Sequence, residues 1–571
     1  MSMLNIGTSA LLTTQASLST TSHNISNVNT DGYNRQRVTQ ATQVPNFEGG
    51  YYIGSGVTVS SVERIFDSFL ADQVRIFTSQ EKSFDTFSTF ASQVDDLLGA
   101  PELSLSSGLQ GFFDAVQDVA DDPTSIPARQ VMLTEADTLA KRFNTLDTQL
   151  NAFNEQVNIN LDAAVKDVNI ISKGIAQLNQ AITEASGGAG VAPNDLMDQR
   201  DQLINQLSGY ISVSTNVQSN GSVNVFIGNG QALVVGQTAV GLKVITDPLD
   251  NTRSEIGYGP SGINVSSQLT GGSIGGLLSV RQDVLDPARA EIDALAAGMI
   301  DTINAQHTVG LTLDGNTGGN FFEPTDALIQ DAGSIRLAIT NPRDIAVAFP
   351  VSTTTNTNNA GTAQLNVTKV SSLVNPAGGQ ALAGDVQLSY ANNQYTVTYQ
   401  GETAVIPYTP GVDSGKSFDL SLLSFSGAPA PTAPDLKITL SGVPANTDNF
   451  TISNSYNGGF TAVGDNRNAL ALAQLQTTKT LNQVNGVATR SFGDAYGILV
   501  ANVATRTHQA SVGQQTQKGL LDQTNLRYES VSGVNLDEEA ANLIKFQQAY
   551  QAASQIITVS NTVFNSLISA M

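Results

Sequence analysis

The longest unbroken pattern in the sequence is helical and runs from about Pro127 to Thr183. Apolar residues recur there at steps of three and four, which predicts a long helix that packs one stripe against a partner helix. The stripe consists of Ala136, Leu139, Phe143, Leu146, Leu150, Phe153 and Val157, then Leu161, Ala164, Val168, Ile171, Ile175, Leu178 and Ile182. The step Phe153–Val157–Leu161 is four plus four, a stutter that unwinds a supercoil locally. The pattern therefore predicts an elongated helical rod.

The amino-terminal end carries a narrower stripe of the same kind. Four apolar residues recur there at seven-residue intervals, beside a seam of small residues that includes Gly7, Thr14 and Thr21. The four are Leu4, Leu11, Leu18 and Ile25. The stripe stops at the turn sequence NTDG (29–32). We expect one coiled-coil helix at this end.

The carboxy-terminal end carries a wider apolar face, and no glycine follows Gly533. Its main stripe is Leu543, Phe546, Tyr550, Ala553, Ile557, Phe564 and Leu567, and a second stripe is Ala549, Ala552, Ile556, Val559 and Val563. So wide a face predicts contact with more than one partner. Because isolated helices are marginal in water, we expect this one to become ordered only against neighbours.

The middle of the chain has strand patterns instead. Alternating apolar residues predict a hairpin at 223–235 around Asn229-Gly230, a second hairpin at 386–399, and a strand at 436–440. The Thr- and Asn-rich stretch 352–362 is typical of a loop or linker. Further helices are expected at 63–98, 194–208, 283–306, 466–480 and 494–527.

These patterns predict an elongated α+β chain with several domains. Coiled-coil and rod domains would be built from both chain ends, with two β-rich outer domains inserted between them. The expected parts are a terminal domain at 1–60 and 525–571, a rod at 61–210, 281–324 and 461–524, a β-rich domain at 211–280, and an outer β-rich domain at 325–460.

Charge and composition limit the partners. The 571 residues include 50 acidic and 27 basic side chains, a net charge of −23, which disfavours nucleic acid and anionic lipid surfaces. No apolar run reaches the length of a membrane span, so membrane insertion is not expected. No basic segment precedes an apolar run at the amino terminus, so we expect no cleavable secretory signal and leave a signal-less export route open. The chain has no cysteine.

No stretch predicts catalysis, a metal or a cofactor. The three histidines, His23, His307 and His508, are far apart in sequence. DGNTGG (314–319) starts like a calcium loop but lacks the ligands that complete one. The carboxylates within 194–201 are expected to follow a helix cap at Asn194 rather than to form a catalytic pair. We therefore predict that the chain is not an enzyme.

Two motifs resemble a known superfamily. NISNVNTDGY (24–33) closely resembles the amino-terminal signature of flagellar axial proteins, which are the rod, hook and hook-associated proteins. SGVNLDEEAANLI (532–544), followed by FQQAYQA (546–552), is similar to their carboxy-terminal signature. Asn535 there suits a helix cap, and the acids that follow it suit a first turn.

Three interior stretches narrow the resemblance to the hook-associated protein 1 family. They are 194–203, GSIGGLL (272–278) running into LDPAR (285–289), and INAQH (303–307). The stretch 325–460 resembles the variable outer β region of that family, with Thr447-Asp448 where the family has a glycine-aspartate pair. Two alternatives remain open at this point: another axial protein of the hook or distal rod, and a surface adhesin with a coiled-coil stalk.

The resemblance implies a function and a set of partners. Copies of the chain would form an adaptor ring between hook and filament, outside the cell, after export by the flagellar type III apparatus. Partners would be further copies, the hook protein, hook-associated protein 3, and a cytoplasmic export chaperone on the carboxy-terminal helix. The expected assembly residues are Leu4, Leu11, Leu18, Asn24, Ile25, Asn27, Asn29, Gly32, Tyr33, Leu543, Phe546, Tyr550, Ala553, Ile557, Phe564 and Leu567.

Overall fold

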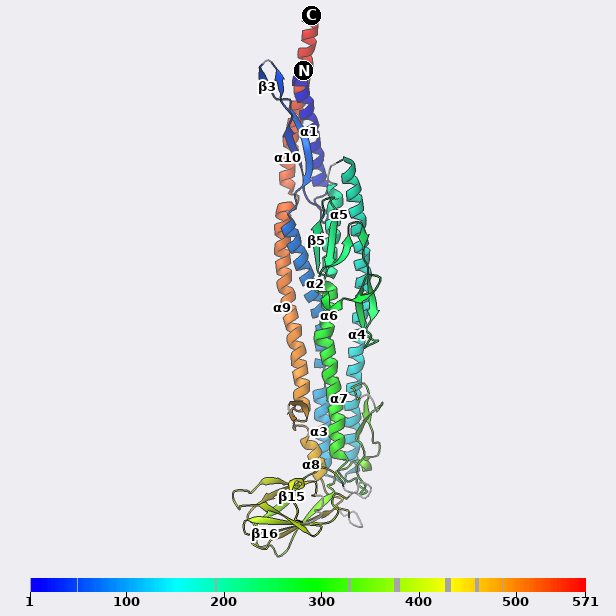
Figure 1. The fold of residues 1–571 in the computed structure, drawn as a ribbon, viewed down its shortest axis with the longest axis vertical. Coiled ribbons are helices and arrows are strands. Elements are labelled where there is room, and N and C mark those ends of the chain that lie inside the picture. Colours follow the sequence, from blue (N-terminus) through cyan, green and yellow to red (C-terminus); the bar gives the residue numbers. More distant parts are fainter. Residues whose placement is uncertain are drawn as a thin grey trace. The chain divides into compact units, whose positions relative to one another are not determined.

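The structure is a computed structural model that describes residues 2–48, 50–189, 193–326, 330–373, 380–426, 433–456, 462–484 and 486–570 (Figure 1). The chain divides into two compact units, each with helices and sheets. Unit 1 comprises Met1–Gln93, Ala152–Leu285 and Ala504–Met571, and unit 2 comprises Val94–Asn151 and Asp286–Val503. The prediction of a mixed helix-and-sheet chain with several domains is confirmed at this level.

The helices of unit 1 include both chain ends. They are α1 (Ser2–Ser26), α5 (Asn194–Tyr210), α6 (Gly272–Val280) and α10 (Leu536–Ala570), together with parts of α2 (Ser68–Gly99), α4 (Ile126–Ala189) and α9 (Phe492–Ser532). The long helix predicted from Pro127 is α4, and its predicted stripe faces inward: Leu139, Leu146, Val157 and Leu161 are buried. The turn predicted after α1 is present, and Gly32 has a φ of +80° that favours glycine.

The chain between α1 and α2 forms strands that the sequence did not predict. β1 (Gln36–Thr42) pairs antiparallel with β4 (Val57–Arg64), and between them β2 (Asn46–Glu48) pairs with β3 (Tyr51–Ile53). These strands lack a clean alternation because most of their side chains are exposed or only half-buried. β1 and β4 therefore form a hairpin, and β2 and β3 extend it where the chain turns back.

Two small sheets complete unit 1. One has the order β5-β6-β7-β8, from β5 (Val213–Val217), β6 (Val223–Ile227), β7 (Gln231–Val235) and β8 (Thr238–Ala239). The other has the order β11-β10-β9, from β9 (Leu242–Thr246), β10 (Ser254–Tyr258) and β11 (Ile263–Asn264). The hairpin predicted around Asn229 is confirmed as β6–β7, with positive φ at the glycines on either side.

The helices of unit 2 are built around aromatic side chains. α3 (Leu105–Asp121), α7 (Asp286–His307) and α8 (Arg467–Gln474) belong here, with strands β12 (Phe322–Pro324), β13 (Ile335–Leu337), β22 (Leu481–Val484) and β23 (Val487–Arg490). Phe112 packs against Phe113, Phe321 and Phe322 with ring centroids 5.1–5.9 Å apart. The sequence did not predict α3, and the helix predicted at 466–480 ends six residues earlier than expected, at Gln474 of α8.

Residues 351–454 of unit 2 form two sheets, which we call the outer β region after the domain predicted at 325–460. One sheet has the order β14-β21-β16-β17-β18, from β14 (Val351–Thr355), β16 (Val386–Ala391), β17 (Gln394–Tyr399), β18 (Glu402–Pro407) and β21 (Asn449–Asn454). The other has the order β15-β20-β19, from β15 (Gln364–Val370), β19 (Lys416–Asp419) and β20 (Leu436–Ser441). The predicted hairpin 386–399 and strand 436–440 are confirmed. The predicted loop 352–362 is wrong at its start, because 351–355 pairs with β21.

Candidate functional site at the junction of the chain ends

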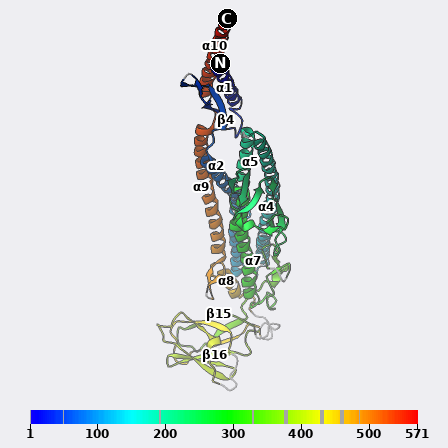
Figure 2. The ribbon, with the colours of Figure 1, turned by 45° about the horizontal axis from the view of Figure 1, so that its top comes forward.

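The two chain ends pack against each other as antiparallel helices, α1 and α10. Two views show them side by side (Figures 1 and 2). Near the start of α1, a Cβ placed on Gly7 would lie 2.9 Å from Ile557 Cγ1, and at its end the Asn24 amide donates to Glu539 Oε2. Glycine at position 7 therefore allows the close approach of the two helices.

The face that α1 turns toward its neighbours is made of small and polar residues. Its buried positions are Gly7, Thr13, Thr14, Ser17, Thr21 and Asn24. The predicted stripe lies beside this face: Leu4 is exposed, and Leu11, Leu18 and Ile25 are half-buried. The apolar residues of α1 are thus left on the flank of the helix pair rather than sealed inside it.

α10 buries even less of its apolar face. Among the described residues of this helix, only Glu539 and Ala553 are buried. Leu543, Phe546 and Ile557 are half-buried, whereas Tyr550, Phe564 and Leu567 are exposed. Four predicted residues of α10 are therefore at least half-buried, and three are exposed. Among the described residues of the pair, Ala553 is the one apolar side chain that is buried.

Asn24 is the polar centre of the junction. Its side-chain Nδ2 donates to the Gln36 carbonyl at 2.9 Å and to Glu539 Oε2 at 3.1 Å. Its Oδ1 accepts from the Gln36 backbone N–H at 3.0 Å and from Tyr33 Oη at 2.8 Å. All four bonds stay within one chain, so the amide ties α1 to β1 and to α10.

Arg35 ties the same segment to the start of α10. Its guanidinium contacts Glu538 Oε2 at 2.5 Å and the buried Glu539 Oε1 at 2.7 Å, and its backbone N–H donates to Ser532 O at 2.8 Å. Asn535 caps α10 as predicted, because its Oδ1 accepts from the backbone N–H groups of Asp537 and Glu538.

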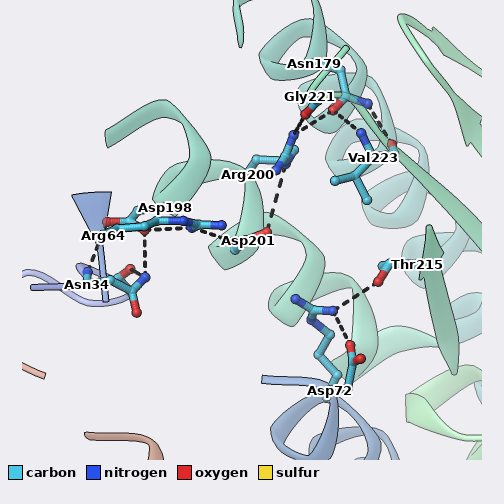
Figure 3. A network of polar contacts seen from close by, with 12 residues as sticks. Asn34, Arg64, Asp72, Asn179, Asp198, Arg200, Asp201, Thr215, Gly221 and Val223 are labelled. Atoms are coloured by element: carbon cyan, nitrogen blue, oxygen red, sulfur yellow. Dashed lines mark hydrogen bonds and ion pairs between the residues drawn. The ribbon is translucent and has the colours of Figure 1, made fainter. Parts of the chain in front are cut away.

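A third group of hydrogen bonds joins the segment that follows α1 to α5 (Figure 3). Asp198 accepts from the Asn34 backbone N–H at 3.0 Å, from Asn34 Nδ2 at 2.6 Å and from Arg64 at 2.9 Å. Arg64 also donates to Asp201 at 2.7 Å. Burial raises the pKa of Asp198, and the Asn34 and Arg64 bonds oppose that rise by favouring the carboxylate.

Helix α9 reaches the same group through one tyrosine. Tyr528 Oη donates to Asn34 Oδ1 at 2.6 Å, and its ring meets Phe66 edge-on. Burial, with the charges of Asp201 and Asp198, raises the pKa of Tyr528 to about 12. The hydroxyl is therefore neutral at physiological pH and remains a donor. The pKa of Tyr33 is also raised, first by burial and then by nearby carboxylates.

α5 is held in place from its other side by a buried arginine (Figure 3). Arg200 donates to Gly221 O at 2.7 Å and to Asn179 Oδ1 at 3.3 Å. Asn179, on α4, bonds both the backbone N–H and the carbonyl of Val223 on β6. Asp198 thus belongs to a helix whose position is fixed by α4 and the sheet.

The helix cap predicted at Asn194 is wrong. Pro193 occupies the cap position, and no side chain caps the helix there. Asn194 Nδ2 instead donates to Val62 O at 2.9 Å. Of the acids that follow it, Asp198 and Asp201 bond to Arg64, and Asp198 also accepts from Asn34. Asp195 accepts from Gln36 Nε2 at 2.7 Å.

The remaining predicted residues, Asn27, Asn29 and Gly32, lie in the turn that follows α1. Asn27 Nδ2 donates to His23 O, and Asn27 Oδ1 accepts from the Thr30 hydroxyl. Asn29 and Gly32 are exposed. The sequence did not single out Asn34, Arg35, Arg64, Asp198 or Glu539 as a group. Positions up to 515 residues apart meet here, and no local pattern encodes such pairings.

The described part of the chain contains no group of three or more His, Asp or Glu side chains that could hold a metal. None of the described helices combines the length and apolarity needed to cross a bilayer. What the site can do is to hold two chain ends against each other and against α5.

Comparisons with known proteins agree with the motifs at both ends. Residues 4–34 match the family model "Flagella basal body rod protein", and residues 527–570 match "Flagellar basal body rod FlgEFG protein C-terminal". Paired terminal helices with these sequences define the class of flagellar axial proteins. Residues 91–322 match the helical domain of flagellar hook-associated protein FlgK.

Full-length relatives identify the family within that class. A flagellar hook-associated protein 1 from Escherichia coli (strain K12) is 32% identical, with 99% of each chain covered, and one from Bacillus subtilis (strain 168) is 27% identical, with 98% of this chain and 96% of its own covered. The structure of the flagellar hook junction protein FlgK from Burkholderia pseudomallei matches with a TM-score of 0.68 at 27% identity, over 81% of this chain and 100% of its own. The chain belongs to the flagellar hook-associated protein 1 (FlgK) family.

The predicted family is therefore confirmed, and the hook, distal-rod and adhesin alternatives are disfavoured. The chain is a structural protein of the bacterial flagellum at the junction between hook and filament.

Proposed function

We propose that copies of this chain form an adaptor ring between hook and filament, on which the filament is assembled. The observation that carries the proposal is the helix pair α1–α10. Its seam is small and polar, whereas Leu4, Phe564 and Leu567 are exposed. Exposed apolar rows on a helix pair are characteristic of surfaces that other proteins cover.

We propose that these apolar rows contact other subunits in the ring. The residues concerned are Leu4, Leu11, Leu18 and Ile25 on α1, with Leu543, Phe546, Tyr550, Ile557, Phe564 and Leu567 on α10. Ala553 is buried and would support these rows from within the helix pair. Asn24, Asn27, Asn29, Gly32 and Tyr33 would shape the end of α1 that presents those rows. The polar junction described above would keep the two helices in register while the ring forms.

The partners would be the hook protein on one side of the ring and hook-associated protein 3 on the other. Before assembly, a cytoplasmic chaperone would cover the exposed face of α10, since that face would otherwise invite aggregation. Export would proceed through the flagellar type III apparatus to the extracellular flagellum. The four-part domain division given above remains a prediction within this proposal.

Deletion of the gene tests the junction role. We expect cells that make hooks without filaments and release flagellin into the medium, with both defects repaired by the intact gene. Normal filaments on the deletion strain would contradict the proposal. Shortened or absent hooks would instead assign the chain to an earlier step of assembly.

A further inference from the structure

The β2–β3 extension exposes an unusual group of large apolar side chains. We call residues 44–48 and 50–53 the arm. Within it Phe47, Tyr51 and Tyr52 are 66%, 77% and 75% exposed, and Val44 and Ile53 are exposed as well. Phe47 and Tyr52 contact only each other among the aromatic rings described, at 5.0 Å between centroids. A two-stranded hairpin with no packed face is marginally stable in water, so the arm needs a partner surface.

The partner surface must accept aromatic rings. Tyr and Phe supply large contact areas at protein interfaces with little loss of side-chain entropy. The sequence of residues 43–56 contains one acidic residue and no basic one. A complementary surface would therefore be a groove that carries positive charge, because cations bind both carboxylates and ring faces.

Unit 1 contains a groove of this kind. It has a volume of about 550 Å³ and opens between α1, β1 and the first half of α10. Its lining includes Thr14, Ser17, Arg37, Lys545, Phe546 and Ala549. Within the described residues neither Arg37 nor Lys545 has an ion-pair partner, and Phe546 is half-buried at the groove wall. In a chain of net charge −23, two unpaired cations in one groove stand out.

The arm points away from the groove of its own chain. β1 runs antiparallel to α1: the Gln36 backbone N–H donates to Asn24, Gln40 Nε2 contacts Ser17, and the Val57 backbone N–H contacts Ser9. The arm continues this path beyond Ser9, toward the start of α1. The groove covers Thr14 to Thr21, on the other side of Ser9.

We infer that the arm of one copy docks into the groove of a neighbouring copy. One chain then carries both halves of the contact at different places on its surface. In the proposed ring each copy gives its arm to one neighbour and receives the arm of the other neighbour, which makes the contact heterologous. Heterologous contacts generate closed rings or open helical assemblies, and not isolated two-fold dimers. The inference rests on the proposed ring and adds the surfaces that would join its members.

Cysteine pairs test this contact directly, because the natural sequence contains no cysteine. Tyr51→Cys and Ala549→Cys are introduced together into the full chain, which replaces the natural one in motile cells. Isolated flagella are treated with a short bismaleimide. We expect a ladder of cross-linked products at multiples of 59.8 kDa. Each single variant should give no product larger than a dimer.

The matched control combines Ala549→Cys with Leu249→Cys, since Leu249 is 98% exposed in the same unit and lies outside the arm. A ladder of equal yield from this pair would overturn the inference. A linked product at monomer mass would mean that the arm reaches its own groove, and a product containing another protein would mean a different partner. Either result would overturn the docking of a second copy.

Antibody labelling of the same flagella separates this inference from the proposed function. If the chain is present at the distal end of the hook but no ladder forms, the arm contact is wrong and the junction role stands. If even the natural chain is absent from that position, both fail. Should the double variant not assemble, a benzoylphenylalanine at position 51 keeps an aromatic ring there. Light should then link it to peptides of the groove, and links elsewhere would overturn the inference.

Discussion

The outer β region and the paired chain ends are stabilised in opposite ways. The β region surrounds an apolar core in which Tyr395, Val397, Ile438 and Phe450 are at most 1% exposed. Among its described residues the α1–α10 pair has no such core, and polar bonds of Asn24 and Arg35 with Glu539 tie its two sides together instead. Apolar burial stabilises a domain by itself, whereas exposed apolar rows contribute only when another surface covers them. The β region therefore buries a core within one chain, and we propose that the terminal pair is completed by other copies.

The largest loss of stability is expected from Phe450→Ala. The ring is buried and packs against Tyr395 at 6.2 Å between centroids, so its removal leaves a cavity that costs about 3–5 kcal/mol. Hydrogen exchange on the full chain should show weaker protection of β16, β17 and β21. Protection of α5, which belongs to unit 1, should not change. A matched loss in α5 would show that the β region does not unfold by itself, and Val405→Ala, at an exposed position, serves as the control.

Asp198→Ala should cost about 3 kcal/mol, since it removes a carboxylate from a buried network and leaves the Asn34 N–H groups unsatisfied. The measurement is the opening free energy of residues 34–42 and of α5 by hydrogen exchange. Asp195→Ala is the matched control on the same helix, where the side chain is 58% exposed, and it should cost less than about 1 kcal/mol. Equal losses of opening free energy in the two variants would show that the junction does not depend on the buried Asp198.

A buried histidine gives unit 2 a dependence on pH. His307 Nε2 accepts from the Ala346 N–H at 2.8 Å, so the proton lies on Nδ1, which donates to Gly319 O at 2.7 Å. Burial, together with the charge of Arg129, lowers the pKa of His307 from 6.5 to about 4. Between pH 4 and pH 6.5 His307 is protonated in the unfolded chain and neutral in the folded chain. Stability is therefore present above pH 6.5 and is lost as the pH falls toward 4.

The expected loss between pH 7 and pH 5 is about 2 kcal/mol for the opening of the segment around Ala346. His307→Gln should remove most of this slope, because an amide does not take up the proton. Thermal unfolding or hydrogen exchange is measured at both pH values, and the loss of stability of the natural chain is compared with that of the His307→Gln variant. An unchanged slope in the variant would assign the dependence to other groups.

The smallest effect on the free chain is expected from Ile557→Asp or Phe546→Asp. Both side chains are only half-buried, so each change should cost no more than about 1 kcal/mol and should leave the thermal transition of the helical middle in place. Junction assembly should nevertheless be blocked. Thr558→Asp, at an exposed neighbouring position, is the control. Loss of the thermal transition in either variant would contradict a role confined to assembly.

The sequence predicted the elements that repeat a simple period. α4 and the hairpin β16–β17 were found because their apolar residues recur at fixed steps, and Asn392 and Asn393 adopt the positive φ of a tight turn. α3 could have been found as well, because Leu105, Leu109, Phe112, Phe113 and Val116 follow a helical period and are all buried.

The site could not be predicted from the same signals. The amino-terminal motif pointed to Asn24 and Tyr33 but not to their partners. Asn34 and Asp198 are 164 positions apart and meet only because α5 is fixed against α4. β1 and β4 were missed because a largely exposed hairpin has no alternation to detect. Periodicity reports burial along one element, and it carries no information about polar bonds between distant ones.

Hydrogen exchange on the free, full-length chain tests the central claim most directly. The quantity to compare is the protection of residues 540–565 with that of strands β16, β17 and β20 in the outer β region. The account predicts strong protection of the strands and fast exchange of 540–565, which should become protected only in assembled flagella. Strong protection of 540–565 in the free chain would show that the terminal pair is stable alone, and would contradict it.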